Sequence, residues 1–174
     1  MRSYDSLWFF TGFSMTIGPI HIGAERLDVP VALAPMAGIT DRPFRRLAAR
    51  LGAPYVVSEM VASREMLHER PLSAIRLRTQ DDEALAAAQI AGCEAEWMAE
   101  AARRVEGGGA RILDINMGCP AKKVTNGYSG SALMRDPDKA LSLIEATVAA
   151  VSIPVTLKMR LGWDEGSMNA PQIA

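Results

Sequence analysis

Short apolar runs alternate along the chain with segments whose apolar residues recur at helical spacing. From residue 31 onward, five such runs have the length and composition of buried strands. They cover residues 31–34, 55–58, 84–90, 111–116 and 155–159. Strands that are joined mostly by helices pair in parallel through right-handed crossovers. The pattern therefore predicts an α/β fold.

Three of the connecting segments carry helix signals. Asp41 is expected to cap the first helix, with Pro43 in its first turn, and Asp136-Pro137 to open the third. Glycine ends the first helix at Gly52 and the second at residues 107–109. The predicted buried faces are Phe44, Leu47, Ala48 and Leu51; then Trp97, Ala101 and Val105; then Leu141, Ile144, Val148 and Val151. Residues 64–78 are polar and weakly patterned, and helix and loop are expected there.

This alternation fits an open doubly wound sheet or a (β/α)8 TIM barrel. The first strand–helix turn lacks the glycine pattern of dinucleotide-binding sheets, which disfavours the open sheet. Polar or reactive side chains follow one predicted strand after another, and a barrel places its active site at that end. These residues are Met36, Glu59, Gln89, Asn116 with Cys119, and Lys158. A full barrel takes roughly 250 residues, so we predict a TIM barrel of which only about the first five strands are present.

The first 24 residues do not share this alternation. The apolar run at residues 7–10 is too short for a signal peptide or a membrane helix. Residues 1–24 are therefore expected to form a leader, disordered or preceding the true start, with Met15 as an alternative start. Residues 25–174 are expected to form the N-terminal portion of the barrel.

Composition narrows the functional classes. The chain has 174 residues, 49% of them hydrophobic, and a net charge of −1, which favours a globular domain and gives no electrostatic support for nucleic-acid binding. Two cysteines, Cys93 and Cys119, make no disulfide framework, so a cytoplasmic location is expected. The two histidines and two cysteines show no metal-ligand spacing, and no metal is predicted.

Cys119 stands out chemically because it lies between Gly118 and Pro120, just past a predicted buried strand. A thiol on such a turn is a candidate nucleophile, metal ligand or proton donor, and also fits a buried small apolar residue. No histidine lies nearby in sequence to activate it as a nucleophile. A thiol with a pKa of about 8.5 stays mostly protonated near neutral pH and suits a general acid.

Five segments, taken in order, carry a family resemblance. They are residues 34–45 (APMAGITDRPFR), 58–60 (SEM), 89–92 (QIAG), 116–124 (NMGCPAKKV) and 155–158 (VTLK). Together they resemble the tRNA-dihydrouridine synthases, and the CPAKKV segment resembles the bacterial B-type subfamily. The resemblance implies FMN-dependent reduction of a uridine in tRNA to 5,6-dihydrouridine, with NADPH or NADH as reductant. It also implies a monomer, no membrane association, and a C-terminal barrel half and helical tRNA-binding domain that are not among these 174 residues.

The resemblance also assigns residue roles. Cys119 matches the cysteine that protonates C5 of uracil, and Asn116 matches a residue beside the target base. Pro35, Met36 and Ala37 match the backbone along the flavin ring, Gln89 the amide at its pyrimidine edge, and Lys158 the lysine that faces it. Lys122, Lys123, Arg42, Arg45 and Arg46 are candidates for tRNA phosphates. Most of these assignments have a structural alternative: a strand–helix turn at residues 35–37, a structural hydrogen bond at Gln89, and a solvated cation at Lys158 and at the phosphate candidates.

Two other functions fit the same residues. One is an FMN barrel oxidoreductase that acts on a small pyrimidine, and tRNA-independent turnover would favour it. The other is a non-catalytic fragment that binds a partner through an open sheet edge, since unpaired edges are adhesive.

Overall fold

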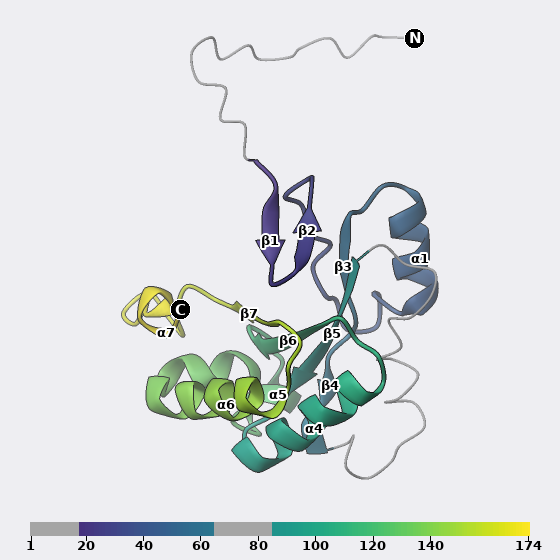
Figure 1. Cartoon of the computed structure of the whole chain (residues 1–174). Coiled ribbons are helices and arrows are strands. Elements are labelled where there is room, and N and C mark those ends of the chain that lie inside the picture. The colour runs from purple at the N-terminus through teal and green to yellow at the C-terminus, as the bar shows by residue number, and fades with distance from the viewer. Residues whose placement is uncertain (1–17, 65–84) are drawn as a thin grey trace, which may run out of the picture.

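The structure, a computed structural model, describes residues 18–64 and 85–174. Its centre is a parallel sheet with strand order β3-β5-β6-β7, in which β4 also pairs with β5 (Figure 1). The strands are β3 (Tyr55–Val57), β4 (Val61–Ala62), β5 (Leu85–Ala91), β6 (Ile112–Met117) and β7 (Val155–Met159). Parallel pairing across the whole sheet confirms the predicted α/β fold.

The predicted strand at residues 31–34 is wrong. Only Leu33 pairs, through one parallel bridge to Val56, and its N–H donates to the Tyr55 carbonyl at 2.8 Å. Pro30 and Pro35 bound this short run and have no N–H to add to a ladder. The four other predicted strands are present. The helix and loop expected at residues 64–78 lie outside the described residues, except for Arg64.

Strands β3 and β4 run along the same edge of β5, and three residues separate them. The Ser58 N–H still donates to the Ala87 carbonyl at 2.9 Å, and the Ser58 hydroxyl accepts from the Gln89 N–H at 2.9 Å. The side chain thus replaces a backbone partner where the strand breaks. This break, which the sequence pattern does not predict, turns Glu59 out of the ladder.

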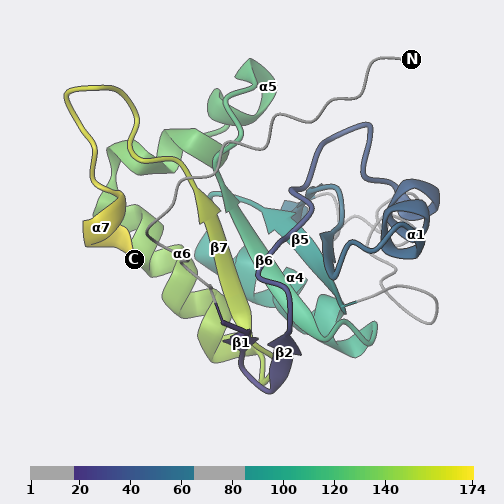
Figure 2. The ribbon, with the colours of Figure 1, turned by 90° about the horizontal axis from the view of Figure 1, so that it is seen from above.

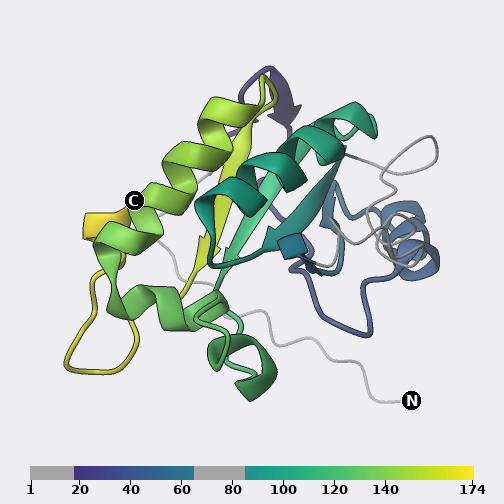
Figure 3. The same cartoon turned by 90° about the horizontal axis from the view of Figure 1, so that it is seen from below.

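Helices α4 (Ala95–Gly107) and α6 (Pro137–Ala150) lie side by side on one face of the sheet (Figure 3). They form the main core with alternate residues of β5 and β6, such as Ile90 and Ile115. On α4 the predicted face is confirmed at Ala101 and Val105, and Trp97 is half-buried. The predicted end of α4 at Gly107 is also confirmed. So is the predicted start of α6, where Asp136 Oδ1 accepts from the Lys139 N–H at 3.0 Å.

The predicted stripe of α6 is partly wrong. Leu141 and Val148 are 50% and 51% exposed, and Ile144 and Val151 are half-buried. The residues in full contact with the core are Ala140, Leu143 and Thr147. The small Ala140 is fully buried in that core, and the Thr147 hydroxyl donates to the Leu143 carbonyl at 2.7 Å. Hydrophobicity alone misplaced the stripe because α6 is apolar on more than one side.

Helix α1 (Arg42–Arg50) begins as predicted, with Asp41 Oδ1 accepting from the Phe44 N–H at 2.9 Å. Its predicted buried face is wrong for the described structure. Phe44, Leu47 and Leu51 are exposed, whereas Arg45 is fully buried. The Arg45 guanidinium Nη1 donates to the Thr40 carbonyl at 2.8 Å, so its burial is compensated by a hydrogen bond within the turn before the helix.

A two-stranded antiparallel hairpin, β1 (Ile20–Ile22) and β2 (Glu25–Leu27), lies across the sheet from α4 and α6 (Figures 1 and 2). Leu27 and Ile22 form a second core with Tyr55, Ala87 and Ile112, near the amino ends of the strands. The expected boundary between residues 24 and 25 falls inside this hairpin.

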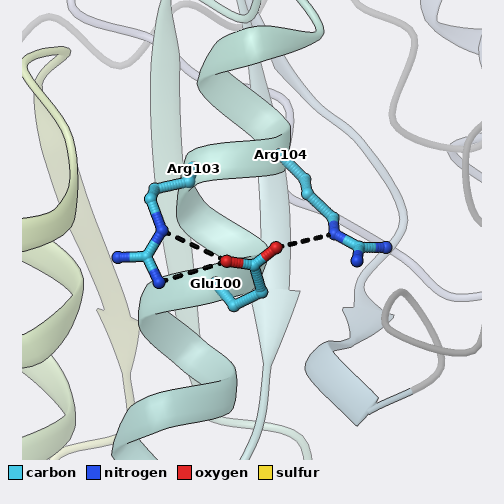
Figure 4. A network of polar contacts seen from close by, with 3 residues as sticks. All are labelled: Glu100, Arg103 and Arg104. Carbon is cyan, nitrogen blue, oxygen red and sulfur yellow. Dashed lines mark hydrogen bonds and ion pairs between the residues drawn. The ribbon is translucent and has the colours of Figure 1, made fainter.

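Between β6 and α6 lie a short helix α5 (Lys122–Thr125) and a 3-10 helix at Gly130–Arg135, and a short helix α7 (Ala170–Ile173) follows β7. On the outer side of α4, Glu100 pairs with Arg103 and Arg104 at 3.1 Å each (Figure 4). Such solvent-facing pairs contribute little to stability. Within the described residues, no helix is long and apolar enough to cross a membrane.

Candidate active site

Alternation along the strands separates two sets of side chains. Ile90, Leu113, Ile115 and Met117 face the helices, so Gln89, Asp114 and Asn116 face the opposite side. The register of β7 places Thr156 beside Asp114 and Lys158 beside Asn116 on that side. A polar row therefore lies above the hydrophobic cluster that the hairpin covers, toward the carboxyl ends of the strands.

The polar row is a connected network. Gln89 Nε2 donates to Asp114 Oδ2 at 2.6 Å, and Asn116 Nδ2 donates to Gln89 Oε1 at 2.9 Å. The Thr156 hydroxyl donates to Asp114 Oδ1 at 2.5 Å. Gln89, Asp114 and Asn116 are 1%, 5% and 8% exposed, so these bonds satisfy groups that water does not reach.

Burial and neighbouring groups also shift the pKa values of Asp114 and Tyr55. Burial raises the pKa of Asp114, while the hydrogen bonds from Thr156 and Gln89 and the charge of Lys158 act in the opposite direction. Burial, and then the charge of Asp114, raises the pKa of Tyr55 to about 12. The buried Tyr55 hydroxyl makes no hydrogen bond of normal geometry. Tyr55 is thus held neutral beneath the carboxylate.

The network ends at the turn that carries Cys119. Asn116 Oδ1 accepts from the backbone N–H groups of Gly118 and Cys119, at 3.2 and 3.0 Å. The Cys119 carbonyl accepts from the Ser131 N–H at 3.0 Å. Cys119 itself is half-buried and not in a disulfide. The thiol is therefore held on a turn that is fixed from both sides.

Gly130 packs directly under this turn. Its φ is +62°, and a Cβ at this position would lie 2.7 Å from the Cys119 carbonyl oxygen. Only glycine meets both conditions without strain. The segment that returns from α5 is thereby tied against Cys119.

The loop at residues 35–40 is held by a separate set of contacts. The Met36 N–H donates to the Thr40 hydroxyl at 2.9 Å, and that hydroxyl donates to the Met36 carbonyl at 3.1 Å. The Gly38 N–H donates to Glu59 Oε1. Glu59, for which the sequence offered no role, thus fixes the loop through the break between β3 and β4.

The predicted site residues therefore fall into two groups. Gln89, Asn116 and Cys119 are linked directly, and Lys158 is the register partner of Asn116, with an exposed side chain. In the described part of the chain, no hydrogen bond joins Pro35, Met36 or Ala37 to this first group. Both groups lie at the carboxyl ends of the strands.

Sequence reasoning missed Asp114 and Thr156. A carboxylate in the middle of an otherwise apolar strand was the available signal for Asp114, because buried charge needs a partner. Of the candidate phosphate-binding cations, Arg45 is excluded by its burial, while Lys122 and Lys123 are exposed on α5. Within the described residues no group of three His, Cys, Asp or Glu side chains is placed to hold a metal.

A curled parallel sheet, covered by helices on one face and carrying polar side chains at its strand ends, defines a TIM-barrel-type α/β fold. Histamine dehydrogenase from Rhizobium sp. 4-9 shares this fold, with a TM-score of 0.57 and 14% identity over 82% of this chain and 32% of that one. The chain belongs to the dihydrouridine synthase (Dus) family, whose model matches residues 32–174.

Curated relatives agree with this assignment. A probable tRNA-dihydrouridine synthase of Rhodobacter capsulatus is 61% identical over 158 residues, which cover 89% of this chain and 48% of that protein. One of Rhizobium leguminosarum is 65% identical over 83% of this chain and 45% of that protein. The tRNA-dihydrouridine synthase B of Pseudomonas aeruginosa is 49% identical over 89% and 47%. The chain thus spans about half the length of the curated relatives it matches.

Proposed function

We propose that this chain forms part of an enzyme that reduces a uridine in tRNA to 5,6-dihydrouridine, and that it supplies the N-terminal portion of the catalytic barrel. The observation that carries the proposal is the buried network that ends on the Cys119 turn, combined with membership of the dihydrouridine synthase family. We place the activity in the cytoplasm, with a monomeric enzyme.

Cys119 is the proposed general acid. The network that holds its turn consists of amides and backbone groups, and no histidine is among them to act as a base toward the thiol. Reduction adds a hydride to C6 of uracil and leaves carbanion character at C5. The Cys119 Sγ–H donates its proton to C5, and the thiolate that forms is reprotonated from solvent.

A bound FMN would supply the hydride, with NADPH or NADH as the proposed reductant of the flavin. The residues present fit a flat heterocycle at this end of the sheet. Gly38 has φ +77° and open space where a Cβ would stand, so its backbone is open to close approach. Gln89 and Asn116 each use one of two amide N–H bonds within the described chain.

In this arrangement Pro35, Met36 and Ala37 would line the flavin ring, and Gln89 would hold its pyrimidine edge. Lys158 supplies a cation that stabilises negative charge on the reduced ring. Asn116 lies beside the uracil. The target base must leave its stack to reach this depth, as in other enzymes that act on bases within folded nucleic acid.

Exposed cations beside the Cys119 turn are the proposed contacts to RNA. Lys122 and Lys123 begin the short helix α5, three and four residues after the thiol. Phosphate contacts of this kind position a nucleic acid without reading its sequence. Removing either charge is expected to weaken tRNA binding and to reduce its salt dependence by about one unit of log–log slope.

The direct test expresses the gene that encodes this chain in a bacterial host from which its own dihydrouridine synthases are deleted. Dihydrouridine in total tRNA is then measured by mass spectrometry of nucleosides. We expect restoration by the unaltered gene and a loss of about 10²-fold or more with Cys119→Ala, in line with removal of a general acid. Cys93→Ala is the matched control and should restore dihydrouridine fully. Absence of dihydrouridine with the unaltered gene would contradict the proposal.

A further inference from the structure

The groups at the two ends of the buried network determine how its two side-chain amides are oriented. At one end, the backbone N–H groups of Gly118 and Cys119 only donate, so the atom of Asn116 that faces them must be its oxygen. Asn116 Nδ2 then faces Gln89, whose oxygen must accept. Gln89 Nε2 is left to face Asp114.

At the other end, an ionised carboxylate only accepts. Asp114 therefore requires the nitrogen of Gln89, the same orientation that the backbone groups require from the far side. If the Gln89 amide were reversed, its oxygen would face the carboxylate. Its nitrogen would then face Asn116, which would have to present its oxygen there and its nitrogen to two backbone donors. Both ends thus favour one arrangement.

We propose that Asp114 is a positioning residue that fixes the direction of the Gln89 and Asn116 amides and, through Asn116, holds the turn that carries Cys119. Thr156 donates to the second oxygen of Asp114, the one that does not contact Gln89. The inference deepens the proposed function: it determines that the site presents N–H donors of Gln89 and Asn116 to a bound heterocycle whose facing atoms are acceptors.

Charge near Asp114 supports this role. The charge of Lys158 on β7 lowers the pKa of Asp114, and Tyr55 on β3, whose own pKa is raised to about 12, carries no charge where a carboxyl titrates. Proton uptake at the network in acid is therefore a property of Asp114. A protonated Asp114 gains a donor, and the requirement for one Gln89 orientation is removed.

The first experiment measures the network without cofactor, by ¹⁵N–¹H NMR of the 174-residue chain. Asp114→Leu removes the acceptor, and Thr156→Val is the matched control because it leaves the Gln89 contact in place. Asp114→Asn keeps an oxygen for Gln89 and gives its nitrogen to the Thr156 hydroxyl. We expect Asp114→Leu to shift or broaden the side-chain amide signals of Gln89 and Asn116 and the backbone N–H signal of Cys119.

The two milder variants should keep these three signals single and near their wild-type positions. If Asp114→Leu does not fold, acid titration of the wild type decides: the three signals should move together in the wild type and stay fixed in Asp114→Asn. A folded Asp114→Leu with unchanged Asn116 and Cys119 signals would overturn the proposal, as would a titration of the wild type that moves none of them.

The second experiment connects the network to the site through FMN affinity, measured by quenching of flavin fluorescence, in the protein expressed from the full gene. Asp114→Leu should weaken FMN binding by about tenfold or more, and Thr156→Val by less than about threefold. Equal affinity in wild type and Asp114→Leu would overturn the positioning role. A wild type that shows the NMR behaviour but forms no dihydrouridine would instead contradict the proposed function and leave the network intact.

Discussion

Arg45 is a cation at the buried side of a helix whose apolar residues face outward. Periodicity assigns positions to a face by hydrophobicity, and it therefore placed Phe44, Leu47 and Leu51 inside. The hydrogen bond from Arg45 to the Thr40 carbonyl depends on a turn that precedes the helix, and no periodic pattern encodes such a contact. Asp114 escaped notice for a similar reason, because its partners come from two other strands.

Tyr55 gives a prediction about pH. Because its folded pKa is raised from 10.0 to about 12, the native state holds this proton more tightly than the unfolded chain. The stabilisation that results from this raised pKa is fully present below pH 10 and is lost as pH rises toward about 12. The free energy of unfolding should therefore fall by roughly 1 kcal/mol from this group between about pH 10 and 11.

Urea denaturation of wild type and Tyr55→Phe across this range measures the effect. The variant should match or slightly exceed the wild type near neutral pH, because the buried hydroxyl has no hydrogen bond of normal geometry to lose. Its advantage should then grow with pH. Parallel pH profiles for the two proteins would show that Tyr55 titrates normally.

Gly130 gives a prediction about the Cys119 turn. Gly130→Ala places a methyl group against the Cys119 carbonyl on a left-handed backbone, so we expect a loss of about 1 kcal/mol or more in stability and a displaced turn. Gly127→Ala is the control, because its Cβ would make an ordinary contact at 3.4 Å with the Val124 carbonyl. Dihydrouridine formation should fall for Gly130→Ala and persist for Gly127→Ala. Equal activity of the two variants would show that Gly130 is not needed to hold the Cys119 turn in place.

At the scale of elements, the sequence located both long helices, with the end of α4 at Gly107 and the start of α6 at Asp136. Asp41 and Asp136 were recognisable as caps because a cap is a local contact between residues three positions apart. Rotation of a helix about its axis is not local. The buried side of α6 was decided by close packing of Ala140 and Leu143 against neighbouring elements.

A matched pair of substitutions on α6 tests this rotation. Leu143→Ala should cost about 2–5 kcal/mol, because it opens a cavity in the main core. Leu141→Ala should change the free energy of unfolding by less than about 0.5 kcal/mol, since half of its side chain faces solvent. Urea unfolding of the two variants compares them directly. Equal losses of unfolding free energy would show that Leu141 is buried as periodicity predicts.

At the scale of the whole molecule, the described sheet curls but its strands form an open series from β3 to β7. The proposed flavin contacts come from the ends of these strands, which make up only part of a closed barrel. A purified polypeptide of residues 1–174 is therefore expected to carry little flavin.

Visible absorbance of that polypeptide, followed by release and quantification of flavin, measures this directly. FMN in near-equal amount to protein would show the opposite: these residues would then complete a flavin site, alone or by pairing with another copy. A negligible amount agrees with a flavin site that these strands alone do not complete.

The sequence by itself determined the alternation of strands and helices, the caps, the family and the positions of Gln89, Asn116, Cys119 and Lys158 at strand ends. Each of these follows from residues close together in the chain or from segments that match a known order. The interruption of the edge strand at Ser58, the hairpin across the sheet and the rotation of α1 and α6 were decided only by tertiary structure. So was the path from Asp114 through Gln89 and Asn116 to Cys119. The physical reason is that hydrogen bonds and close packing between strands depend on register, and register joins residues that the sequence separates by 25 positions or more.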